Sequence, residues 1–462
     1  MSPRLARLTA IALLASACED PTPLAVDASS DARVEASVSD VVDVSDVSDV
    51  SDASDASDAS NASDVSDASD VSDAGDVSDA SDAADVTDAG PVCRTACVGR
   101  RSCVRGRCVD AWLSIASLDA PGPRSDLGAV ATDQAFIVWG GGRLGVPYGD
   151  GGRFDLATNR WSALPSLGAP SARLKPSMVW TGSEVIIWGG RVTPDLSDAG
   201  ARYNPATDAW RPLATTGAPP ARYDGIVVWT GREMIVWGGL GASGLLGDGA
   251  RYDPAMDRWS PITMTGAPSP RIAPFAAWTG TELIVWAGAT ADPAMPSDGA
   301  RYDPATDTWR AMATDGATTG RSQGGAAWTG SELFAWGGYD ARGVEQATGA
   351  LYDPDIDRWR PVPMTDAPTA RAEFTTVWTG SEVIVWGGHR SDFTVRPTLI
   401  ERTDTGAAFD PRRYAWRAVE SLGAPSARDR HAGVWTGSEM LVWGGLSGTG
   451  PASSGGRFQP PP

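Results

Sequence analysis

The sequence predicts an all-β protein: a seven-bladed β-propeller over residues 111–462, closed by an N-terminal strand and preceded by a disordered acidic stalk. Tryptophans recur at intervals of 49 or 50 residues, with one interval of 57. Each interval holds four short apolar runs separated by Gly and Pro, and no helical periodicity is found. A period of this length with four strands in each unit is typical of a propeller, because each blade is one four-stranded sheet.

The strands of one unit follow from its turn signals. The segment "PPARYDGIVVW" leads into a first strand that ends at Trp229, a Thr-Gly-Arg-Glu turn follows, and "EMIVWGG" forms a second strand. After a loop, "GARYDP" forms a third strand, and an Asp-Pro turn separates it from a fourth strand, "DRWSPI". The apolar runs do not alternate cleanly with polar residues, which is expected where both faces of a sheet are covered.

Three recurring series account for all 20 tryptophans of the chain. One series precedes the glycine pairs, one closes each unit, and one ends the first strands, where Ala131 stands in place of a seventh member. We expect these tryptophans to pack between neighbouring sheets. The ends of the repeat region also complete each other. Residues 455–459 supply a third strand without a closing strand, and the segment around Trp112 is a closing strand without a unit of its own. Pairing the two would complete seven blades and remove the open edges.

Several short motifs recur through residues 111–462. They are glycine pairs such as Gly189-Gly190, a Tyr and a Trp seven residues apart (Tyr302 and Trp309), and the "AP..R" segment from Ala169 to Arg173. In these motifs the chain resembles the kelch family of β-propellers. The resemblance implies the same closed fold.

The repeat also contains departures and constant positions. Ala287 replaces the first glycine of one pair, and Leu351 and Ala408 interrupt an arginine series before the third strand. Residues present in every unit are interpreted as scaffold. The arginine before each first strand, for example Arg173, falls in this class, and the glutamate that recurs in the turn, for example Glu184, is interpreted in the same way. We expect the arginines to make polar bonds from blade to blade.

The two faces of the predicted propeller differ in variability. In a four-stranded blade the 1–2 and 3–4 turns share one face, and the 2–3 and 4–1 connections share the other. The first set is short and repetitive, whereas the 2–3 loops differ in every blade, and the longest covers residues 389–407. Because binding specificity usually lies in loops on a rigid scaffold, we place the site on the 2–3/4–1 face.

One variable position lies two residues after each recurrent arginine. We expect its members to ring the mouth of the central channel on the 2–3/4–1 face: Asp126, Lys175, Asp224, Ala273, Gln323, Glu373 and Arg430. The other candidate ligand-binding residues near this mouth are Arg143, Tyr148, Arg191, Tyr339, His389, Arg390, Phe393 and His431. The alternative interpretation is a solvated rim without a binding role.

The N-terminal region indicates export. Residues 1–17 have two arginines, an apolar run and then small residues, the pattern of a signal peptide too short to span a bilayer permanently. Cys18 follows these small residues, and we expect it to be lipidated in a bacterial envelope, with the outer membrane favoured. Ordinary cleavage after "ASA" is the alternative, and it would give a secreted protein.

A linker and a cysteine-rich segment precede the repeats. Residues 18–90 consist mainly of Ser, Asp, Ala and Val, with 21 acidic residues against Arg33 between positions 19 and 90, and should be disordered. Residues 91–110 hold the remaining four cysteines, and an exported protein favours two disulfides over a zinc site. All three pairings remain open for Cys93, Cys97, Cys103 and Cys108.

Charge and motifs limit the classes of function. The net charge of −20 arises in the linker, since residues 91–462 hold 35 basic and 37 acidic residues, and nothing suggests nucleic acid binding. The family includes galactose oxidase, whose copper site needs a cysteine cross-linked to tyrosine. All five cysteines here lie at or before Cys108, and the two histidines do not define a copper or zinc site.

The favoured interpretation is a surface-anchored, non-catalytic binding module for a glycan or a protein, monomeric and without cofactor or metal. One alternative is a carbohydrate-active enzyme of the hydrolase or epimerase type, with Asp224 and Glu373 as its candidate carboxylates. The other alternative is a structural docking platform in an envelope complex.

Overall fold

The computed structural model describes residues 101–104, 107–392 and 399–461, and side chains from residue 111 onward. The signal peptide, Cys18, the acidic linker, Cys93 and Cys97 therefore lie outside the described residues. Within the described ranges the regular elements are all β-strands. A hairpin of β1 (Arg101–Val104) and β2 (Arg107–Asp110) places Cys103 opposite Cys108 in its backbone register.

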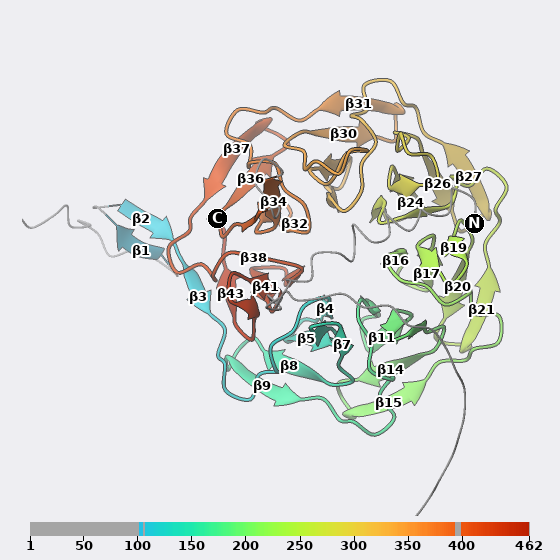
Figure 1. The fold of residues 1–462 in the computed structure, drawn as a ribbon, viewed down its shortest axis with the longest axis horizontal. Helices are drawn as coiled ribbons and strands as arrows, with labels where there is room; N and C mark the ends of the chain where they lie inside the picture. The colour runs from blue at the N-terminus through green and yellow to red at the C-terminus, as the bar shows by residue number, and fades with distance from the viewer. Residues whose placement is uncertain (1–100, 105–106, 393–398, 462) are drawn as a thin grey trace, which may run out of the picture. The chain divides into compact units, whose positions relative to one another are not determined.

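Seven four-stranded antiparallel sheets form a ring in residues 112–458, which confirms the predicted propeller (Figure 1). The innermost strands are β4 (Gly128–Ala131), β10 (Ser177–Trp180), β16 (Ile226–Trp229), β23 (Phe275–Trp278), β28 (Gly325–Trp328), β32 (Thr375–Trp378) and β39 (Ala432–Trp435). The second strands are β5 (Ala135–Trp139), β11 (Val185–Trp188), β17 (Met234–Trp237), β24 (Leu283–Trp286), β29 (Leu333–Trp336), β33 (Val383–Trp386) and β40 (Met440–Trp443).

The outer half of each blade follows the same order. The third strands are β8 (Gly151–Asp155), β14 (Gly200–Asn204), β20 (Gly249–Asp253), β26 (Gly299–Asp303), β30 (Gly349–Asp353), β36 (Gly406–Asp410) and β43 (Gly455–Phe458). The outermost strands are β9 (Arg160–Ala163), β15 (Ala209–Pro212), β21 (Arg258–Pro261), β27 (Thr308–Ala311), β31 (Arg358–Pro361), β37 (Ala415–Val419) and β3 (Trp112–Ser114).

Short strands lie in or beside the 2–3 loops and pair with one another rather than with the blades. They are β6 (Gly142–Arg143), β7 (Val146–Pro147), β12 (Arg191–Val192), β13 (Asp195–Leu196), β18 (Leu240–Gly241), β19 (Gly244–Leu245), β22 (Arg271–Ile272), β25 (Ala289–Thr290), β34 (His389–Asp392), β35 (Leu399–Arg402), β38 (Arg428–Asp429), β41 (Leu446–Ser447) and β42 (Gly450–Pro451).

The ring closes as predicted, by pairing the two ends of the repeat region. β3 is the outermost strand of the seventh blade, and Trp112 lies opposite Phe458 of β43. This noncovalent closure gives the seventh blade its fourth strand, so every blade is a complete sheet with only short edge strands.

The core lies between the blades, because each second strand is buried on both faces. In β11 every residue from Val185 to Trp188 is fully buried. Each second-strand tryptophan contacts the outermost-strand tryptophan of the next blade, with ring centroids 4.9–6.3 Å apart. The outermost-strand indoles also donate 2.7–2.9 Å hydrogen bonds to carbonyls of the preceding blade. The prediction that tryptophans pack between sheets is confirmed.

The recurrent arginines form hydrogen bonds through both the side chain and the main chain. The hydrogen bonds of the Arg173 side chain stay within its own blade, where Nη1 donates to the carbonyls of Gly189 (2.8 Å) and Ala199 (2.7 Å). Its guanidinium also lies over the ring of Trp139 in the preceding blade, 5.9 Å from the centroid. The blade-to-blade bond comes instead from its main chain, because Gly141 of the preceding blade donates to the Arg173 carbonyl over 2.9 Å. The expected polar bond from blade to blade is therefore made by the main chain of Arg173 and not by a hydrogen bond of its side chain. A guanidinium this deeply buried satisfies its donors best on the carbonyls of its own 2–3 loop.

The interrupted arginine series is compensated across the sheet. In blade four Arg301 of the third strand lies 3.4 Å from Glu282 of the turn. In blade five Leu351 takes the equivalent position, and Arg360, opposite it on β31, binds Glu332 over 2.7 Å. The turn glutamate of blade five is therefore still paired with an arginine, which comes from the outermost strand instead of the third strand.

Candidate functional site

The predicted ring residues share a rare backbone conformation. Asp126, Lys175, Asp224, Ala273, Gln323, Glu373 and Arg430 all have positive φ, between 48° and 56°. None is glycine, although this left-handed region is the one that glycine occupies most easily. The conformation therefore belongs to the scaffold, and the side chains that it presents differ from blade to blade.

Main-chain hydrogen bonds explain why all seven positions share this conformation. The N–H of each ring residue donates to the carbonyl of the ring residue in the preceding blade, over 2.7–3.3 Å, at six of the seven junctions. The exception is the junction between Lys175 and Asp224. There the side chains make the link, with Lys175 Nζ 2.7 Å from Asp224 Oδ2. The ring is thus a nearly continuous circle of hydrogen bonds around the channel.

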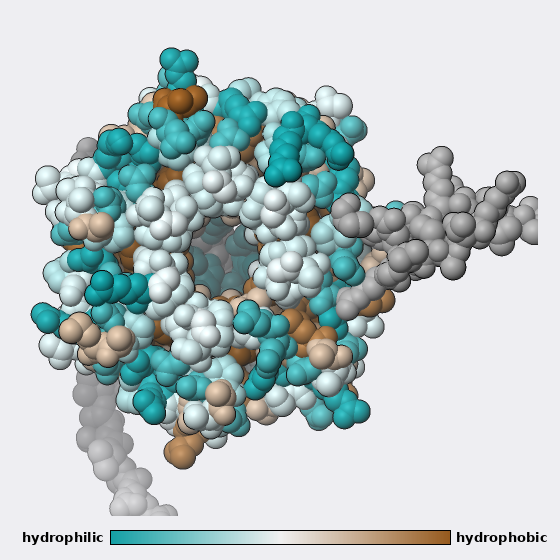
Figure 2. Space-filling view, turned by 180° about the vertical axis from the view of Figure 1, so that it is seen from behind, coloured by the Kyte–Doolittle hydropathy of each residue, from teal (hydrophilic) through white to brown (hydrophobic). Residues whose placement is uncertain are grey.

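The ring residues line one cavity of about 440 Å³ at the centre of the propeller. Leu127, Met178, Phe374 and His431 also line it. Figure 2, the view from behind, shows the central opening rimmed by residues of near-neutral hydropathy, with hydrophilic residues visible inside it. The cavity therefore combines charged and amide groups with a smaller apolar surface.

Both cations of the ring are paired with carboxylates. Arg430 Nε donates to Glu373 Oε2 over 2.7 Å, and Lys175 binds Asp224. Burial lowers the pKa of Lys175, but the carboxylates of Asp224, Asp126 and Glu373 raise it by more, so its pKa lies above the ordinary value. The same balance of burial against Glu373 and Asp126 raises the pKa of Arg430. Both cations are therefore firmly charged in the cavity wall.

Some predicted residues lie away from the cavity. Arg143 is exposed on β6, and Arg191 packs over the ring of Tyr223, 5.5 Å from its centroid. Tyr148 lies under the guanidinium of Arg124, 4.8 Å from it. None of these three lines the cavity.

The blade-six hairpin is only partly described. Arg390, exposed on β34, pairs with Glu401 over 2.8 Å and does not line the cavity. Phe393 lies outside the described residues.

His431 lines the cavity but is held in the scaffold. Its Nε2 lies 2.8 Å from Thr375 Oγ1, and its ring meets Trp386 edge-on with centroids 5.3 Å apart. Burial, reinforced by the charge of Arg428, lowers the pKa of His431 to about 3, so the ring is neutral. We assign His431 to the packing of blades six and seven.

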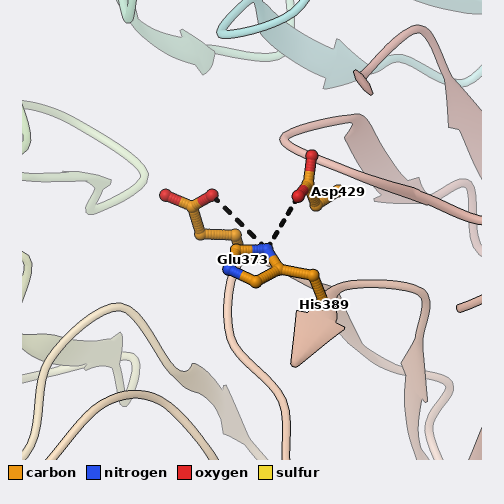
Figure 3. Close-up of side chains that lie close together, drawn as sticks. All are labelled: Glu373, His389 and Asp429. Atoms are coloured by element: carbon orange, nitrogen blue, oxygen red, sulfur yellow. Dashed lines mark ion pairs between the residues drawn. The ribbon is translucent and has the colours of Figure 1, made fainter. Parts of the chain in front are cut away.

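A second cluster lies directly behind Glu373. His389 begins β34, and its Nε2 lies 2.6 Å from the hydroxyl of Tyr339 in blade five. Its Nδ1 lies 2.7 Å from Asp429 Oδ2 in blade seven and 3.9 Å from Glu373 Oε2. Figure 3 shows this nitrogen between the two carboxylates. Three blades thus contribute to one group around a histidine that is 1% exposed.

The surroundings of this cluster are charged and buried. Glu345 Oε1 lies 3.9 Å from His389 Nε2 and accepts hydrogen bonds from the main chain and hydroxyl of Ser391. Arg402 Nε lies 3.3 Å from Asp429 Oδ2. Burial lowers the pKa of His389, but contact with Asp429 and the charges of Glu373 and Glu345 raise it by more. Burial raises the pKa of Asp429, but His389 and Arg402 lower it by more, so its pKa lies below the ordinary value and this carboxylate is ionised.

Sequence reasoning missed Asp429, Glu345 and Arg402. A signal for Asp429 was present, because it directly follows a recurrent arginine, at a position where the other six blades have Ser, Leu, Tyr, Ile, Ser and Ala. The sequence prediction considered only histidines and cysteines as metal ligands, although carboxylates can also be ligands. Within the described residues, one atom each from Glu373, His389 and Asp429 lies within 4.8 Å of the others, a grouping that could hold a metal ion.

Comparison with known families supports the fold. Residues 126–338 match the KLHDC2/KLHL20/DRC7 Kelch-repeats domain. These residues belong to the kelch-repeat family. Kelch repeats build propellers that serve in general as protein-binding modules, and the remaining blades of this chain carry the same motifs. No curated protein matches the chain. The structure has no helix in its described part that is long and apolar enough to cross a membrane.

Proposed function

We propose that this kelch propeller is a non-catalytic binding module that takes a glycan or protein ligand into the cavity at the centre of its 2–3/4–1 face. One observation carries the proposal: seven left-handed positions present differing side chains, none of them glycine, to a single cavity. A left-handed backbone costs an L-residue about 1–2 kcal/mol. The same blades use glycine at other left-handed positions, so the retained side chains point to a use in recognition.

The chemistry of the lining favours a glycan over a charged ligand. The two cations of the ring are already paired with Asp224 and Glu373, so a strongly charged ligand would have to break an ion pair. A neutral polyhydroxylated ligand could instead bond to these groups and to the amide of Gln323 without displacing them. Phe374 could receive the C–H face of a sugar ring. A volume of about 440 Å³ suits a short oligosaccharide end.

The proposal extends to the position of the module in the cell. A lipid on Cys18 and an extended acidic linker over residues 18–90 would hold the propeller away from a bacterial membrane. This placement rests on the signal-like N-terminus and on the linker composition. Labelling with radioactive palmitate would test the anchor, since Cys18→Ser should abolish incorporation of the label.

Binding is tested with the purified chain on a glycan panel, followed by calorimetry on any ligand found. We expect Gln323→Ala and Asp224→Asn to weaken binding about tenfold or more, because each removes a polar group from the cavity. The matched controls are Gln134→Ala and Asp133→Asn, which change the same residue types at exposed positions of a 1–2 turn. The controls should bind normally.

The outcome distinguishes the ligand classes. Glycan binding that is lost in the cavity variants and kept in the controls supports the proposal in its glycan form. If a protein partner is captured from an envelope extract and the cavity variants weaken its binding, the ligand of the cavity is a protein and not a glycan. Binding that is unaffected by both cavity variants would refute the location.

A further inference from the structure

We infer that Glu373, His389 and Asp429 form a binding site for one divalent first-row transition-metal ion such as Zn²⁺. The inference does not depend on the ligand proposed above, although Glu373 belongs both to this site and to the cavity wall. The three residues come from blades six and seven and meet behind the ring. A metal ion here would link Glu373 of the cavity wall to His389 on β34 and Asp429 on β38.

The geometry of the three donor atoms is close to that of a coordination site. Zinc bonds of about 2.1 Å place two ligand atoms of a tetrahedral site about 3.4 Å apart. The distances from His389 Nδ1 to Asp429 Oδ2 and to Glu373 Oε2 are 2.7 and 3.9 Å, one on either side of that value. All three donor atoms lie within 4.8 Å of one another, so the two carboxylates would have to move toward each other to share one ion.

Two buried atoms also lack hydrogen-bond partners. His389 Nδ1 finds no acceptor in a suitable direction among the described residues, although Asp429 Oδ2 is near. Asp429 Oδ1 is likewise without a partner in the described part of the chain. The two side chains are 1% and 2% exposed, so water from bulk solvent does not easily satisfy them. Orphaned polar atoms this deeply buried are uncommon and call for a ligand or ion.

The groups around the triad suit metal ligands. A metal-binding histidine usually donates its second ring N–H to a fixed oxygen, and here Tyr339 lies 2.6 Å from Nε2. Ligating carboxylates are in turn held by hydrogen bonds. Arg430 holds Glu373 and Arg402 approaches Asp429. Because an ionised carboxylate has about four lone-pair sites, each can serve an arginine and a metal ion together.

The local charge favours a dication. Five carboxylates surround the cavity wall and the histidine, whereas three cations lie among them, which leaves two negative charges in excess when His389 is neutral. The carboxylates are Asp126, Asp224, Glu345, Glu373 and Asp429, and the cations are Lys175, Arg402 and Arg430. A divalent ion would balance the excess. The imidazole ligand selects a transition metal over Ca²⁺ or Mg²⁺, which prefer oxygen alone.

The test uses NMR on the full chain labelled with ¹⁵N-histidine, because the chain has only two histidines and their ring nitrogens can be told apart. We expect one equivalent of Zn²⁺ to shift the Nδ1 signal of His389 and to leave His431 nearly unchanged. Calcium should have no effect on either ring at the same concentration. Metal bound by the acidic linker or by the cysteines does not move these two ring signals, and the equivalents are counted after the zinc taken up by those sites is subtracted.

Variants then assign the oxygen ligands. Glu373→Gln and Asp429→Asn should each weaken the Zn²⁺-dependent shift at least tenfold, and Tyr339→Phe should weaken it about tenfold as an orienting group. Asp126→Asn is the matched control, since it removes one charge from the same ring but no ligand, and it should keep most of the affinity. Assignment of the His389 signal in the unvaried chain keeps the test decisive even if a variant folds poorly.

Either result is informative. A His389 shift that saturates at one equivalent and fails in both carboxylate variants supports the site. Zn²⁺ binding that leaves His389 unmoved, or a shift equally reduced by Asp126→Asn, would overturn it. Glycan or protein binding by a chain whose His389 signal is unmoved by Zn²⁺ would leave the proposed function standing and remove only the metal.

Discussion

The two glycines of each pair should differ sharply in their tolerance of a side chain. In blade two, Gly189 has φ of 69° and Gly190 has φ of 96°. A Cβ on Gly190 would lie 2.7 Å from the carbonyl oxygen of Leu174 and 3.2 Å from that of Lys175. By contrast, a Cβ on Gly189 would have one tight contact, 3.0 Å from the carbonyl oxygen of Arg222. We therefore compare Gly189→Ala with Gly190→Ala.

The magnitudes follow from conformation and space. At Gly189 an alanine pays for a left-handed backbone of about 1–2 kcal/mol and regains about 0.4–1 kcal/mol through a less flexible unfolded chain, a net loss near 1 kcal/mol. Blade four already has Ala287 at this place, with φ of 52°. At Gly190 the strain is about 1–3 kcal/mol, and overpacking against backbone atoms adds about 1–3 kcal/mol. We expect Gly190→Ala to cost about 2–3 kcal/mol more than Gly189→Ala.

The assay is urea unfolding followed by tryptophan fluorescence and far-UV circular dichroism in parallel. The midpoint should fall slightly for Gly189→Ala and strongly for Gly190→Ala, and the second variant should also perturb the cavity, since Lys175 is part of the contact. Equal losses for the two variants, or a larger loss for Gly189→Ala, would refute the reasoning from close approach.

Two further predictions concern charge. Lys175 and Asp224 should show a coupling of about 1–2 kcal/mol in a double-mutant cycle of Lys175→Gln and Asp224→Asn, because each stabilises the other in a partly enclosed cavity; additive losses in urea unfolding would count against the pair. Burial raises the pKa of Asp257, but the Tyr252 hydroxyl, the Ala214 N–H and Arg202 lower it by more, so its pKa in the folded state lies below the ordinary value. The unfolded chain then takes up the proton first as the pH falls, so this contribution to stability is complete above about pH 4 and is lost below it. Thermal melting between about pH 5 and 2 should show a shallower decline for Asp257→Asn than for the unvaried chain; identical slopes would show that Asp257 contributes nothing.

The fold could be predicted because its signals are local and repeated. A second strand such as β11 needs only four apolar residues and a glycine pair, and those signals occur seven times at nearly constant spacing. Closure by Trp112 could be inferred from counting strands at the two ends. The side-chain bonds of Arg173 could not, because a constant residue in each unit shows that a contact is structural without showing which blade supplies its partner.

The ring around the cavity was predictable for a related reason. In a propeller, equivalent positions of all blades face the same axis, so a variable column in the repeat becomes a circle in space. Sequence could therefore place Lys175 and Glu373 together although they are far apart in the chain. Their left-handed backbone could not be predicted, because Lys and Glu have no preference for it and only the hydrogen-bonded circle imposes it.

The metal triad marks the limit of this approach. His389 begins β34, Asp429 stands on β38 of the next blade, and Glu373 lies in the ring, so no single column of the repeat contains all three. Their proximity depends on how the loops of blades six and seven pack against each other, which the repeat alone does not specify. A repeat nevertheless supplies its own comparison, since an acidic residue at a position that is otherwise small or apolar, as Asp429 is, must be balanced by something nearby when it is buried. A residue that departs from the repeat is thus a candidate for a role that the fold alone does not require. At Asp429 the ¹⁵N-histidine experiment tests whether that role is to bind a cation.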